Sequence, residues 1–493
     1  MSLVGFVAVS PQSLWIDEAN TATKALAPDW EAFVSAMVTE KGSDQQMPLY
    51  MVLIWLWEKA VGSSEFALRA LNIPLLALAI AWIIGRTRIS LSVRLWFVVF
   101  ACVSPMVWAY LDEARPYILQ FFGGGLIMSS LVNLTNNPQG KPPKTHDALV
   151  AVGGALILYT ASLLSALSLV FFGSAFLILW FRAEPLSVTL RRPMFLGAIS
   201  LMMVVFVGCG IYYIWTLLLG SGASNIAQTN IHSVMFCIYE FMGFMGMGPG
   251  RAALRAGGAS ELMRHVPALF IYIVALSVWA SACFPFAYRN AFLIIVRYKI
   301  IITTVIIIFM AFTVVGIVAD FRILGRHLMF LLPFVLLGMA GLSAGAFRNA
   351  SVLRQCGVTT LPAVMLISCL NIRFSVIHAK DDYRSSAVET SKYLANGKVV
   401  WWAADKAGAA YYSLSPVVFR ESEVSSSGGK LYLVNARSTE YLESLPFPDL
   451  VVLSKVDIYD ANGTLREFLQ KRAFQIDQVF PAMTLWKPVS KQD

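Results

Sequence analysis

The sequence predicts a polytopic α-helical membrane protein that carries a small α/β domain at its C-terminal end. Of the 493 residues, 57% are hydrophobic and only 14% are charged, whereas a soluble domain usually carries about 25% charged residues. Apolar stretches of helix-spanning length follow one another between residues 67 and 374. From about residue 375 the composition becomes charged and polar. We therefore predict a transmembrane domain over 1–374 and an extracytoplasmic α/β domain over 375–493.

The chain begins with an apolar stretch, 1–10, that is shorter than the roughly 20 residues a transmembrane helix needs. It has neither the basic segment nor the cleavage site of a signal peptide. We expect it to be a first transmembrane helix that is truncated in this reading frame. A polar loop, 11–46, follows, and then the aromatic-rich segment 47–62, which contains Glu58 and Lys59.

Apolar stretches predict ten further spans, which bring the total to about 11 transmembrane helices. The predicted spans are 67–85, 95–111, 116–133, 148–163, 165–181, 194–219, 266–287, 299–319, 328–346 and 358–374.

Loop charge predicts the orientation of these spans, because loops on the cytoplasmic side carry an excess of Lys and Arg. One alternate set of loops holds most of the basic residues, and only Glu184 and the boundary residue Asp147 oppose them. The basic residues of that set are Arg86, Arg88, Arg94, Lys141, Lys144, Arg182, Arg191, Arg192, Arg289, Arg297, Lys299, Arg348 and Arg354. The other loops then lie on the extracytoplasmic side; they are 11–66, 112–115, the turn near 164, 220–265, 320–327 and the tail.

This assignment holds only if 47–62 does not cross the membrane. A crossing there would place Asp17 and the 112–117 segment on opposite sides and would break the charge rule. We therefore expect 47–62 to be an interfacial helix on the outer face, with Trp55 and Trp57 at headgroup depth.

The tail from 375 onward carries 14 basic and 14 acidic residues. Its patterns predict helices over 385–395 and 463–472 and a flexible loop over Ser425–Gly429. The predicted strands are 398–403, 430–434, 449–453, 474–480 and 483–487.

The net charge of +9 does not indicate nucleic-acid binding, because the excess cations sit in short loops between apolar stretches. The six cysteines form no CxxC motif and no Cys/His cluster, so neither a disulfide framework nor a zinc site is predicted. They are Cys102, Cys209, Cys237, Cys283, Cys356 and Cys369.

Two acidic motifs lie at predicted outer boundaries of the membrane. The first is Asp17-Glu18, and the second is Asp112-Glu113, which Arg115 and Tyr117 follow closely. Acidic residues at a membrane boundary are candidates for a functional site, because charge close to the bilayer is costly. The alternative interpretation is that the first pair marks a loop and that the second motif contains an exposed Glu–Arg pair worth about 0–1 kcal/mol.

Two further outer segments supply arginines. Gly246–Arg251 is a Gly/Pro-rich turn that presents Arg251, and Arg326 with His327 precedes a late span, shortly after Asp320-Phe321-Arg322. Arginines there could bind a phosphate bidentately, or they could anchor the helix ends at the interface. His232 and His265 show no metal-ligand spacing.

Carboxylates and arginines at an outer membrane face suit the transfer of a sugar from a polyprenyl phosphate. The acceptor hydroxyl needs a base, which an aspartate can supply. The departing lipid phosphate gains negative charge, which arginines or a divalent metal ion can stabilise. No nucleotide-sugar domain is needed for this reaction, and none is seen.

These motifs together resemble the GT-C class of polyprenyl-phosphate-dependent glycosyltransferases, and most closely the branch of the protein O-mannosyltransferases (family 39) and the lipid A aminoarabinose transferase. The resemblance covers most of the chain and rests on the order and spacing of short motifs. They are Trp15-x-Asp17-Glu18-Ala19, Pro48-Leu49-Tyr50, Ser64–Arg69, Ser104-Pro105, Glu113-Ala114-Arg115 with Tyr117, Gly325-Arg326-His327, Asp382-Tyr383-Arg384 and Val400–Ala403.

The resemblance implies an inverting transfer of a hexose or pentose on the outer face of the inner (plasma) membrane. The acceptor would be an envelope glycan or lipid, and in second place a protein. Asp17 would be the catalytic base and Glu18 its neighbour in the site, which Asp112, Glu113 and Arg115 would complete.

The chain departs from the resemblance at one position. Relatives often have a histidine or lysine before the Pro-Leu-Tyr element, whereas this chain has Gln45-Gln46-Met47. The residue that holds the donor phosphate is therefore open among Arg69, Arg115, Arg251 and Arg326, with Tyr117 and His327 as further substrate contacts. No closed set of metal ligands is evident, so a divalent metal ion is left open.

Two other classes of function compete with a transferase. A transporter or flippase of lipid-linked glycans would be expected to carry charges inside its spans or broken helices in repeated halves, and no repeat is seen. A membrane scaffold that displays the C-terminal domain would leave both acidic motifs unexplained.

Overall fold

A computed structural model gives the structure of the chain. It describes residues 2–40, 42–138, 141–219, 228–251, 253–254, 258, 260–348, 350–417, 430–435 and 438–489. The predicted loop Ser425–Gly429 lies outside these ranges.

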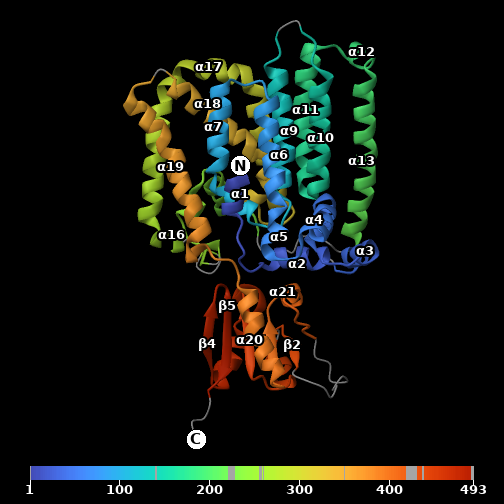
Figure 1. Cartoon of the computed structure of the whole chain (residues 1–493), viewed down its shortest axis with the longest axis vertical. Coiled ribbons are helices and arrows are strands. Elements are labelled where there is room, and N and C mark those ends of the chain that lie inside the picture. The colour runs from blue at the N-terminus through green and yellow to red at the C-terminus, as the bar shows by residue number, and fades with distance from the viewer. Residues whose placement is uncertain are drawn as a thin grey trace.

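The described part of the chain forms a bundle of long helices with a small sheet domain below one end of it (Figure 1). Among the described residues, seven helical segments are long and apolar enough to cross a membrane. They are α5–α6 (Glu65–Arg86), α9 (Tyr117–Thr135), η2–α11 (Leu163–Ala183), α13 (Pro193–Leu218), α17 (Val266–Val318), η4–α18 (Gly325–Phe347) and α19 (Val352–Phe374). The chain is thus an integral membrane protein, as its composition predicts.

An eighth span is formed if α7 (Leu91–Cys102) and α8 (Pro105–Leu111) are counted as one bent pair, since they meet at 55°. The bend falls at Ser104-Pro105. The Ser104 hydroxyl accepts a hydrogen bond from the backbone N–H of Val107, and proline fits the first turn of the new helix. The predicted span 95–111 is therefore helical but interrupted.

Each of the ten predicted spans is mostly helical, although the helix ends and lengths differ from the prediction. Helix α10 (Thr145–Ala161) has only 17 residues. Helix α17 has 53 residues and contains both 266–287 and 299–319, so the segment between them is helical rather than a loop. That segment has neither glycine nor proline. A straight helix of this length would extend about 80 Å, far beyond a bilayer, and Figure 1 shows α17 turning across the end of the bundle that faces away from the sheet.

The N-terminal elements meet the bundle at the end that faces the sheet domain. Helix α1 (Ser2–Ala8) packs against α6 (Asn72–Arg86). Helices α2 (Ile16–Ala25), α3 (Trp30–Thr39) and α4 (Pro48–Val61), with the short turn η1 (Ser43–Gln46), lie between the bundle and the sheet (Figure 1). Helix α4 confirms that 47–62 is helical. The indole N–H of Trp55 donates to the Ala27 carbonyl at 3.0 Å, which ties α4 to the α2–α3 loop.

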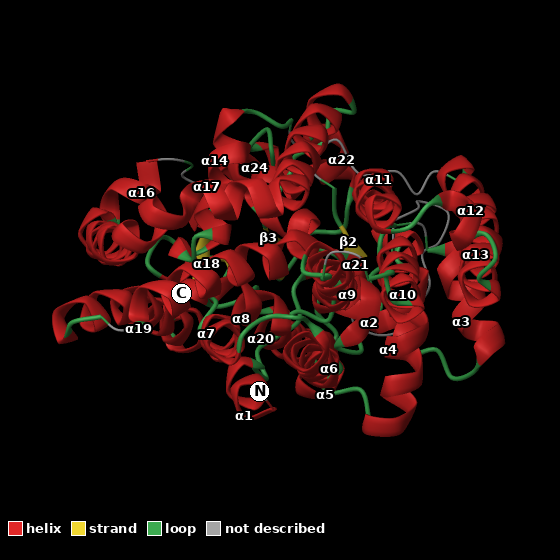
Figure 2. Cartoon of the chain, turned by 90° about the horizontal axis from the view of Figure 1, so that it is seen from above, coloured by secondary structure: helices red, strands yellow, loops and turns green. Residues whose placement is uncertain are grey.

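Viewed end on, the bundle has two sides (Figure 2). Helices α9, α10, α11 and α13 lie on one side, and α17, α18 (Leu332–Phe347) and α19 lie on the other. The shorter elements are α5 (Glu65–Ala70), α11 (Ala166–Ala183), η2 (Leu163–Ser165), α12 (Leu186–Thr189), α14 (Ile231–Phe241), η3 (Phe244–Gly246), α16 (Ser260–Arg264), η4 (Gly325–Leu331) and η5 (Val376–His378). Helix α12 lies at the end of the bundle away from the sheet (Figure 1).

The C-terminal domain has a five-stranded sheet in the order β2-β1-β3-β5-β4. Strand β1 pairs in parallel with β2 and β3, whereas β5 pairs antiparallel with β3 and β4. The strands are β1 (Val400–Ala403), β2 (Leu431–Leu433), β3 (Leu450–Ser454), β4 (Phe474–Phe480) and β5 (Met483–Pro488), and the helices are α20 (Tyr383–Ala395), α21 (Lys406–Tyr411), α22 (Thr439–Ser444), α23 (Val456–Tyr459) and α24 (Thr464–Lys471).

Alternation along β1 places a tryptophan on each face of this sheet. Trp401 belongs to one hydrophobic cluster with Phe468, and Trp402 belongs to the other with Tyr383. Both faces of the sheet are therefore covered, and the small α/β domain predicted from the tail is confirmed. All five predicted strands and both predicted helices are present, with ends that differ by at most two residues.

Candidate active site

The first acidic motif opens helix α2. The backbone N–H of Trp15 donates to the Glu18 carboxylate at 3.4 Å, and both acids lie in the first turn, where they complement the helix dipole. Neighbouring residues on a helix point about 100° apart. Glu18 accordingly faces the protein and is fully buried, whereas the Asp17 side chain keeps 28% of its surface exposed.

Glu18 is enclosed by cations. Arg69 donates to its two oxygens at 2.8 and 2.7 Å, the Ala114 N–H donates at 2.8 Å, and Lys380 Nζ lies at 3.2 Å. Burial by itself would raise the pKa of this carboxyl, but the charges of Arg69 and Lys380 outweigh it and lower the pKa from 4.5 to about 2. Glu18 is thus a fixed anion that holds α2 to the segment after α8.

Arg69 directs all five of its N–H groups at protein oxygens. Besides Glu18, its partners are the carbonyls of Ser10 at 2.9 Å, Gln12 at 2.6 Å and Ser13 at 3.0 Å. The side chain is fully buried. Arg69 was one of the predicted phosphate contacts. All of its N–H groups are used within the protein, so none is available for a donor phosphate, and the side chain holds the 10–18 loop in place.

Asp112 belongs to the same set of contacts. It accepts hydrogen bonds from the Ser10 N–H at 2.5 Å and from the Ser10 hydroxyl at 2.9 Å, and Lys380 Nζ lies 3.3 Å from its carboxylate. We call Glu18, Arg69, Asp112 and Lys380 the closed cluster, because their charges compensate one another in a buried or nearly buried place.

Lys380 is a member of this cluster that the sequence analysis missed. It lies in the segment that joins α19 to the C-terminal domain and bridges the two acidic motifs, since it contacts both Glu18 and Asp112. It is also the first lysine or arginine after the last predicted span, at the outer boundary of the membrane domain. That position is the signal that could have identified it.

Arg115 is also used within the protein. It donates to the Asp44 carboxylate at 2.6 Å, to the Thr21 hydroxyl at 2.9 Å and to the Ser43 hydroxyl at 3.0 Å. Lys24 binds the same carboxylate at 2.8 Å. The pKa of Asp44 is lowered, because these two cations outweigh the effect of burial. The sequence analysis did not identify Lys24 and Asp44, because an ion pair that becomes buried on folding leaves no pattern in a polar segment.

The carboxylate of Asp17 faces a different set of residues. One of its oxygens lies 3.5 Å from Arg326, which comes from the start of η4. Arg326 also lies over the Trp15 ring at 5.6 Å, and Lys455 from the C-terminal domain lies 5.4 Å from the same ring. Lys455 forms an ion pair with Asp381 at 2.6 Å. Asp17 thus sits where the N-terminal loop, η4 and the C-terminal domain converge.

Glu113 forms the second carboxylate–arginine pair, with Arg251. Its other oxygen, Oε2, is buried and has no hydrogen-bond partner among the described residues. A buried carboxylate oxygen without a donor is costly, and such an atom calls for a ligand or water. We call Asp17–Arg326 and Glu113–Arg251 the open pairs, because in each pair part of a carboxylate has no donor in the part of the chain that the structure describes.

A buried acid supports both open pairs. Glu240 of α14 accepts from the Tyr110 hydroxyl at 2.8 Å and from the Gly325 N–H at 2.7 Å, directly before Arg326. Arg251 lies over the Tyr110 ring at 5.1 Å. Burial raises the pKa of Glu240, against the opposing charge of Arg251. The sequence analysis missed this residue, which sits in an apolar helix where a lone acid is the available signal.

The remaining predicted residues have structural contacts. Tyr117 packs edge to face on Tyr110 with ring centroids 4.9 Å apart. His327 Nδ1 accepts the Leu324 N–H at 3.2 Å and so helps to start η4. Gln45 replaces the cation expected from the resemblance, and its side-chain amide donates to the Met37 carbonyl at 2.6 Å.

No group of three or more His, Cys, Asp and Glu side chains gathers among the described residues.

These contacts define a membrane protein whose polar site is assembled at one end of a helix bundle, next to a small sheet domain. Two solved structures share this fold. ArnT from Cupriavidus metallidurans bound to undecaprenyl phosphate matches with a TM-score of 0.52 and 11% identity, over 99% of this chain and 96% of that chain. The apo state of the same protein matches with a TM-score of 0.50 and 11% identity, over 98% and 95% of the two chains.

The fold is therefore that of the GT-C glycosyltransferases, and the resemblance predicted from the motifs is confirmed at the level of the fold. The arabinofuranosyltransferase AftD from Mycobacteria matches with a TM-score of 0.39 and 11% identity, over 100% of this chain and 39% of that chain. No family model and no curated protein sequence matches this chain.

Proposed function

We propose that this protein is an inverting glycosyltransferase that moves a sugar from a polyprenyl-phosphate carrier to an acceptor on the outer face of the membrane. The observation that carries the proposal is the pair of half-free carboxylates, Asp17 and Glu113, each beside an arginine from a distant segment. Such a site offers a base and two cations within one GT-C fold. ArnT, which shares the fold, has been solved with undecaprenyl phosphate.

The mechanism needs one displacement at the anomeric carbon. Asp17 accepts the proton of the acceptor hydroxyl, and the oxygen of that hydroxyl forms the new bond to the anomeric carbon. The bond between the carbon and the phosphate oxygen breaks, and the departing polyprenyl phosphate keeps the electron pair. Arg326 and Arg251 stabilise the charge that develops on the phosphate. The free Oε2 of Glu113 accepts a hydrogen bond from a hydroxyl or amino group of a substrate.

The closed cluster has a different task in this proposal. Glu18, Arg69, Asp112 and Lys380 fix the loop that carries Asp17, because each bond joins a different segment of the chain. Correct placement of the base can contribute a large part of the rate enhancement of a reaction. These residues therefore position the site without contacting substrate.

Transfer in vitro tests the proposal. Purified protein is incubated with a panel of undecaprenyl-phosphate sugars and with envelope lipids, glycans and peptides as acceptors. We expect transfer from at least one donor and a loss of about 10²–10⁴-fold in Asp17→Asn, the usual contribution of a general base. The matched control is Glu31→Gln, an exposed acid of the same loop region, which should keep full activity.

Several results would contradict the proposal. Full activity in Asp17→Asn would remove this residue as the base. Movement of a lipid-linked glycan across vesicles without any sugar transfer would favour the flippase alternative instead. A folded protein that neither transfers nor moves any member of the panel would favour the scaffold alternative.

We also propose that the C-terminal domain lies on the extracytoplasmic side of the membrane and that α4 lies along the outer interface. Cysteine labelling in intact cells tests this. In a background without native cysteines, Val388→Cys on α20 should react with an impermeant maleimide, and Val188→Cys in α12 should not; these side chains are 53% and 47% exposed. The opposite result would invert the orientation.

A further inference from the structure

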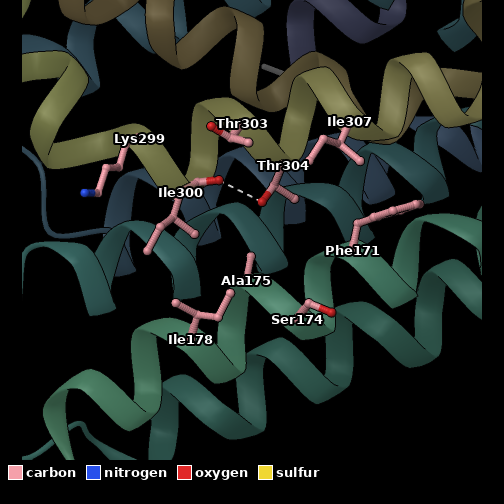
Figure 3. A pocket seen from close by; sticks show the side chains of 9 residues that line it. All are labelled: Phe171, Ser174, Ala175, Ile178, Lys299, Ile300, Thr303, Thr304 and Ile307. Atoms are coloured by element: carbon pink, nitrogen blue, oxygen red, sulfur yellow. Dashed lines mark hydrogen bonds between the residues drawn. The ribbon is translucent and has the colours of Figure 1, made fainter.

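A groove between α11 and α17 lies away from the carboxylates of the candidate active site. It encloses about 320 Å³, and nine side chains line it (Figure 3). They are Phe171, Ser174, Ala175 and Ile178 of α11 and Lys299, Ile300, Thr303, Thr304 and Ile307 of α17. Helix α11 leads into α12, at the end of the bundle opposite the sheet (Figure 1). Helix α2, which carries Asp17, lies at the other end, next to the sheet (Figure 1).

Small side chains explain why the two helices leave a hollow here. The lining residues recur three and four positions apart on both helices, so they share one seam. At the middle of this seam Ala175 faces Thr304, and Ser174 and Thr303 lie next to them on the two helices (Figure 3). The shorter side chains do not fill the space that the larger residues at either end hold open.

The wall of the groove is hydrocarbon. The Ser174 hydroxyl donates to the Val170 carbonyl at 2.8 Å, and the Thr304 hydroxyl donates to the Ile300 carbonyl at 2.7 Å. These hydroxyls are thus satisfied within their own helices and face the groove mainly with carbon. An apolar chain would fit such a wall, whereas a polar molecule would find few partners.

Lys299 gives the groove one charged end. It is the one charged residue of the lining. Lys299 is exposed, and in the part of the chain that the structure describes its side chain makes neither a hydrogen bond nor an ion pair. Arg297 lies two residues before it on the same helix. The groove therefore offers an apolar channel with an uncompensated cation at its mouth.

The length of the groove matches one leaflet. Lys299 and Ile307 are eight residues apart on α17, which is about 12 Å along a helix. Half of the hydrocarbon core of a bilayer is about 15 Å. A chain whose headgroup sits at Lys299 would therefore reach close to the midplane.

We propose that this groove is a binding site for one anionic phospholipid, whose acyl chain lies between α11 and α17 and whose phosphate contacts Lys299. Basic pockets between transmembrane helices bind anionic headgroups in this way. A zwitterionic lipid would fill the groove but would bring its own cation close to Lys299. The site is independent of the proposed transfer reaction, because it uses none of the residues assigned to it.

Native mass spectrometry of the full-length protein tests this. The protein is reconstituted into nanodiscs with equal amounts of phosphatidylglycerol and phosphatidylcholine, and the lipid retained after release is counted. We expect one retained phosphatidylglycerol, and at least a tenfold loss of the preference over phosphatidylcholine in Lys299→Gln. Ser174→Leu, which fills the groove from an exposed position, should lower the retention of both lipids.

The control is Arg289→Gln, which removes the same charge from the same helix at a position outside the groove. It should retain phosphatidylglycerol as the unmodified chain does. Equal retention of the two lipids by the unmodified protein would overturn the proposal. Equal losses in Lys299→Gln and Arg289→Gln would also overturn it, because they would indicate general attraction to a basic surface. Displacement of the retained lipid by equimolar undecaprenyl phosphate would reassign the groove to the carrier.

Discussion

The closed cluster and the open pairs consist of the same residue types but have different roles. In the closed cluster, Glu18 receives two N–H groups of Arg69, a backbone N–H and Lys380. In the open pairs, and counting the described residues alone, the Asp17 carboxylate has one contact at 3.5 Å, and Glu113 keeps one buried oxygen without a donor. A carboxylate that is fully paired holds chain segments together, whereas one with a free oxygen is available to a substrate. The number of donors around each acid, and not its place in a motif, separates these tasks.

Breaking the closed cluster at Arg69 should have the largest effect on stability. In Arg69→Met, Glu18 keeps its burial but loses its main partner, and removal of one member of a buried ion pair costs about 3–5 kcal/mol. We expect a strongly lowered free energy of unfolding in detergent, with activity lost as a consequence. Arg326→Met, in an open pair, should cost less than about 1 kcal/mol. Equal losses in the two variants would remove the distinction between the clusters.

Acid should weaken the stabilisation that Glu18 gives to the closed cluster. The pKa of Glu18 is lowered in the folded protein from 4.5 to about 2, so its stabilisation is present above pH 4.5 and is lost as the pH falls from there toward 2. The difference corresponds to about 3 kcal/mol. Unfolding measured between pH 6 and pH 3 should show this slope in the unmodified chain. The slope should be reduced in Glu18→Gln, and an unchanged slope would place the effect elsewhere.

Lys380 tests whether the C-terminal domain helps to hold the site. Lys380→Met removes one cation from Glu18 and Asp112, and a lost charged hydrogen bond of this kind costs about 1–3 kcal/mol. We expect faster hydrogen exchange in 10–18 and a lower kcat, with partial rescue by Lys380→Arg. Lys392→Met is the control, because that lysine pairs with Glu389 on the exposed side of α20. A loss of the same size in the control would show a general effect of charge.

A similarly small effect on stability is expected in the second open pair. Glu113→Gln keeps the shape of the side chain and can donate a hydrogen bond from the position of the free oxygen. We expect a change in the free energy of unfolding of about 1 kcal/mol, together with a raised KM or lowered kcat in the transfer assay. A variant with normal transfer kinetics would exclude Glu113 from substrate contact and would leave Asp17 as the sole reactive acid.

Much of the architecture could be predicted from composition and periodicity. Apolar stretches placed the helices of the bundle, and short alternating runs placed all five strands of the tail. The continuity of α17 was not predicted, because Arg289 and Arg297 mark a loop by charge, although the residues between them include neither glycine nor proline. The bend between α7 and α8 was missed for a similar reason, since the apolar run continues through Ser104-Pro105.

The sequence by itself determined that this is a membrane protein of the GT-C fold and that two acidic motifs lie near each other at one end of it. The tertiary structure decided which acid of each motif is held and which is free. Asp17 and Glu18 are adjacent, so hydrophobic pattern cannot say which of them faces the protein. That depends on Arg69 and Lys380, which reach Glu18 from positions 51 and 362 residues further along the chain. Electrostatic pairing over such separations leaves no local pattern, and only folding brings the charges together.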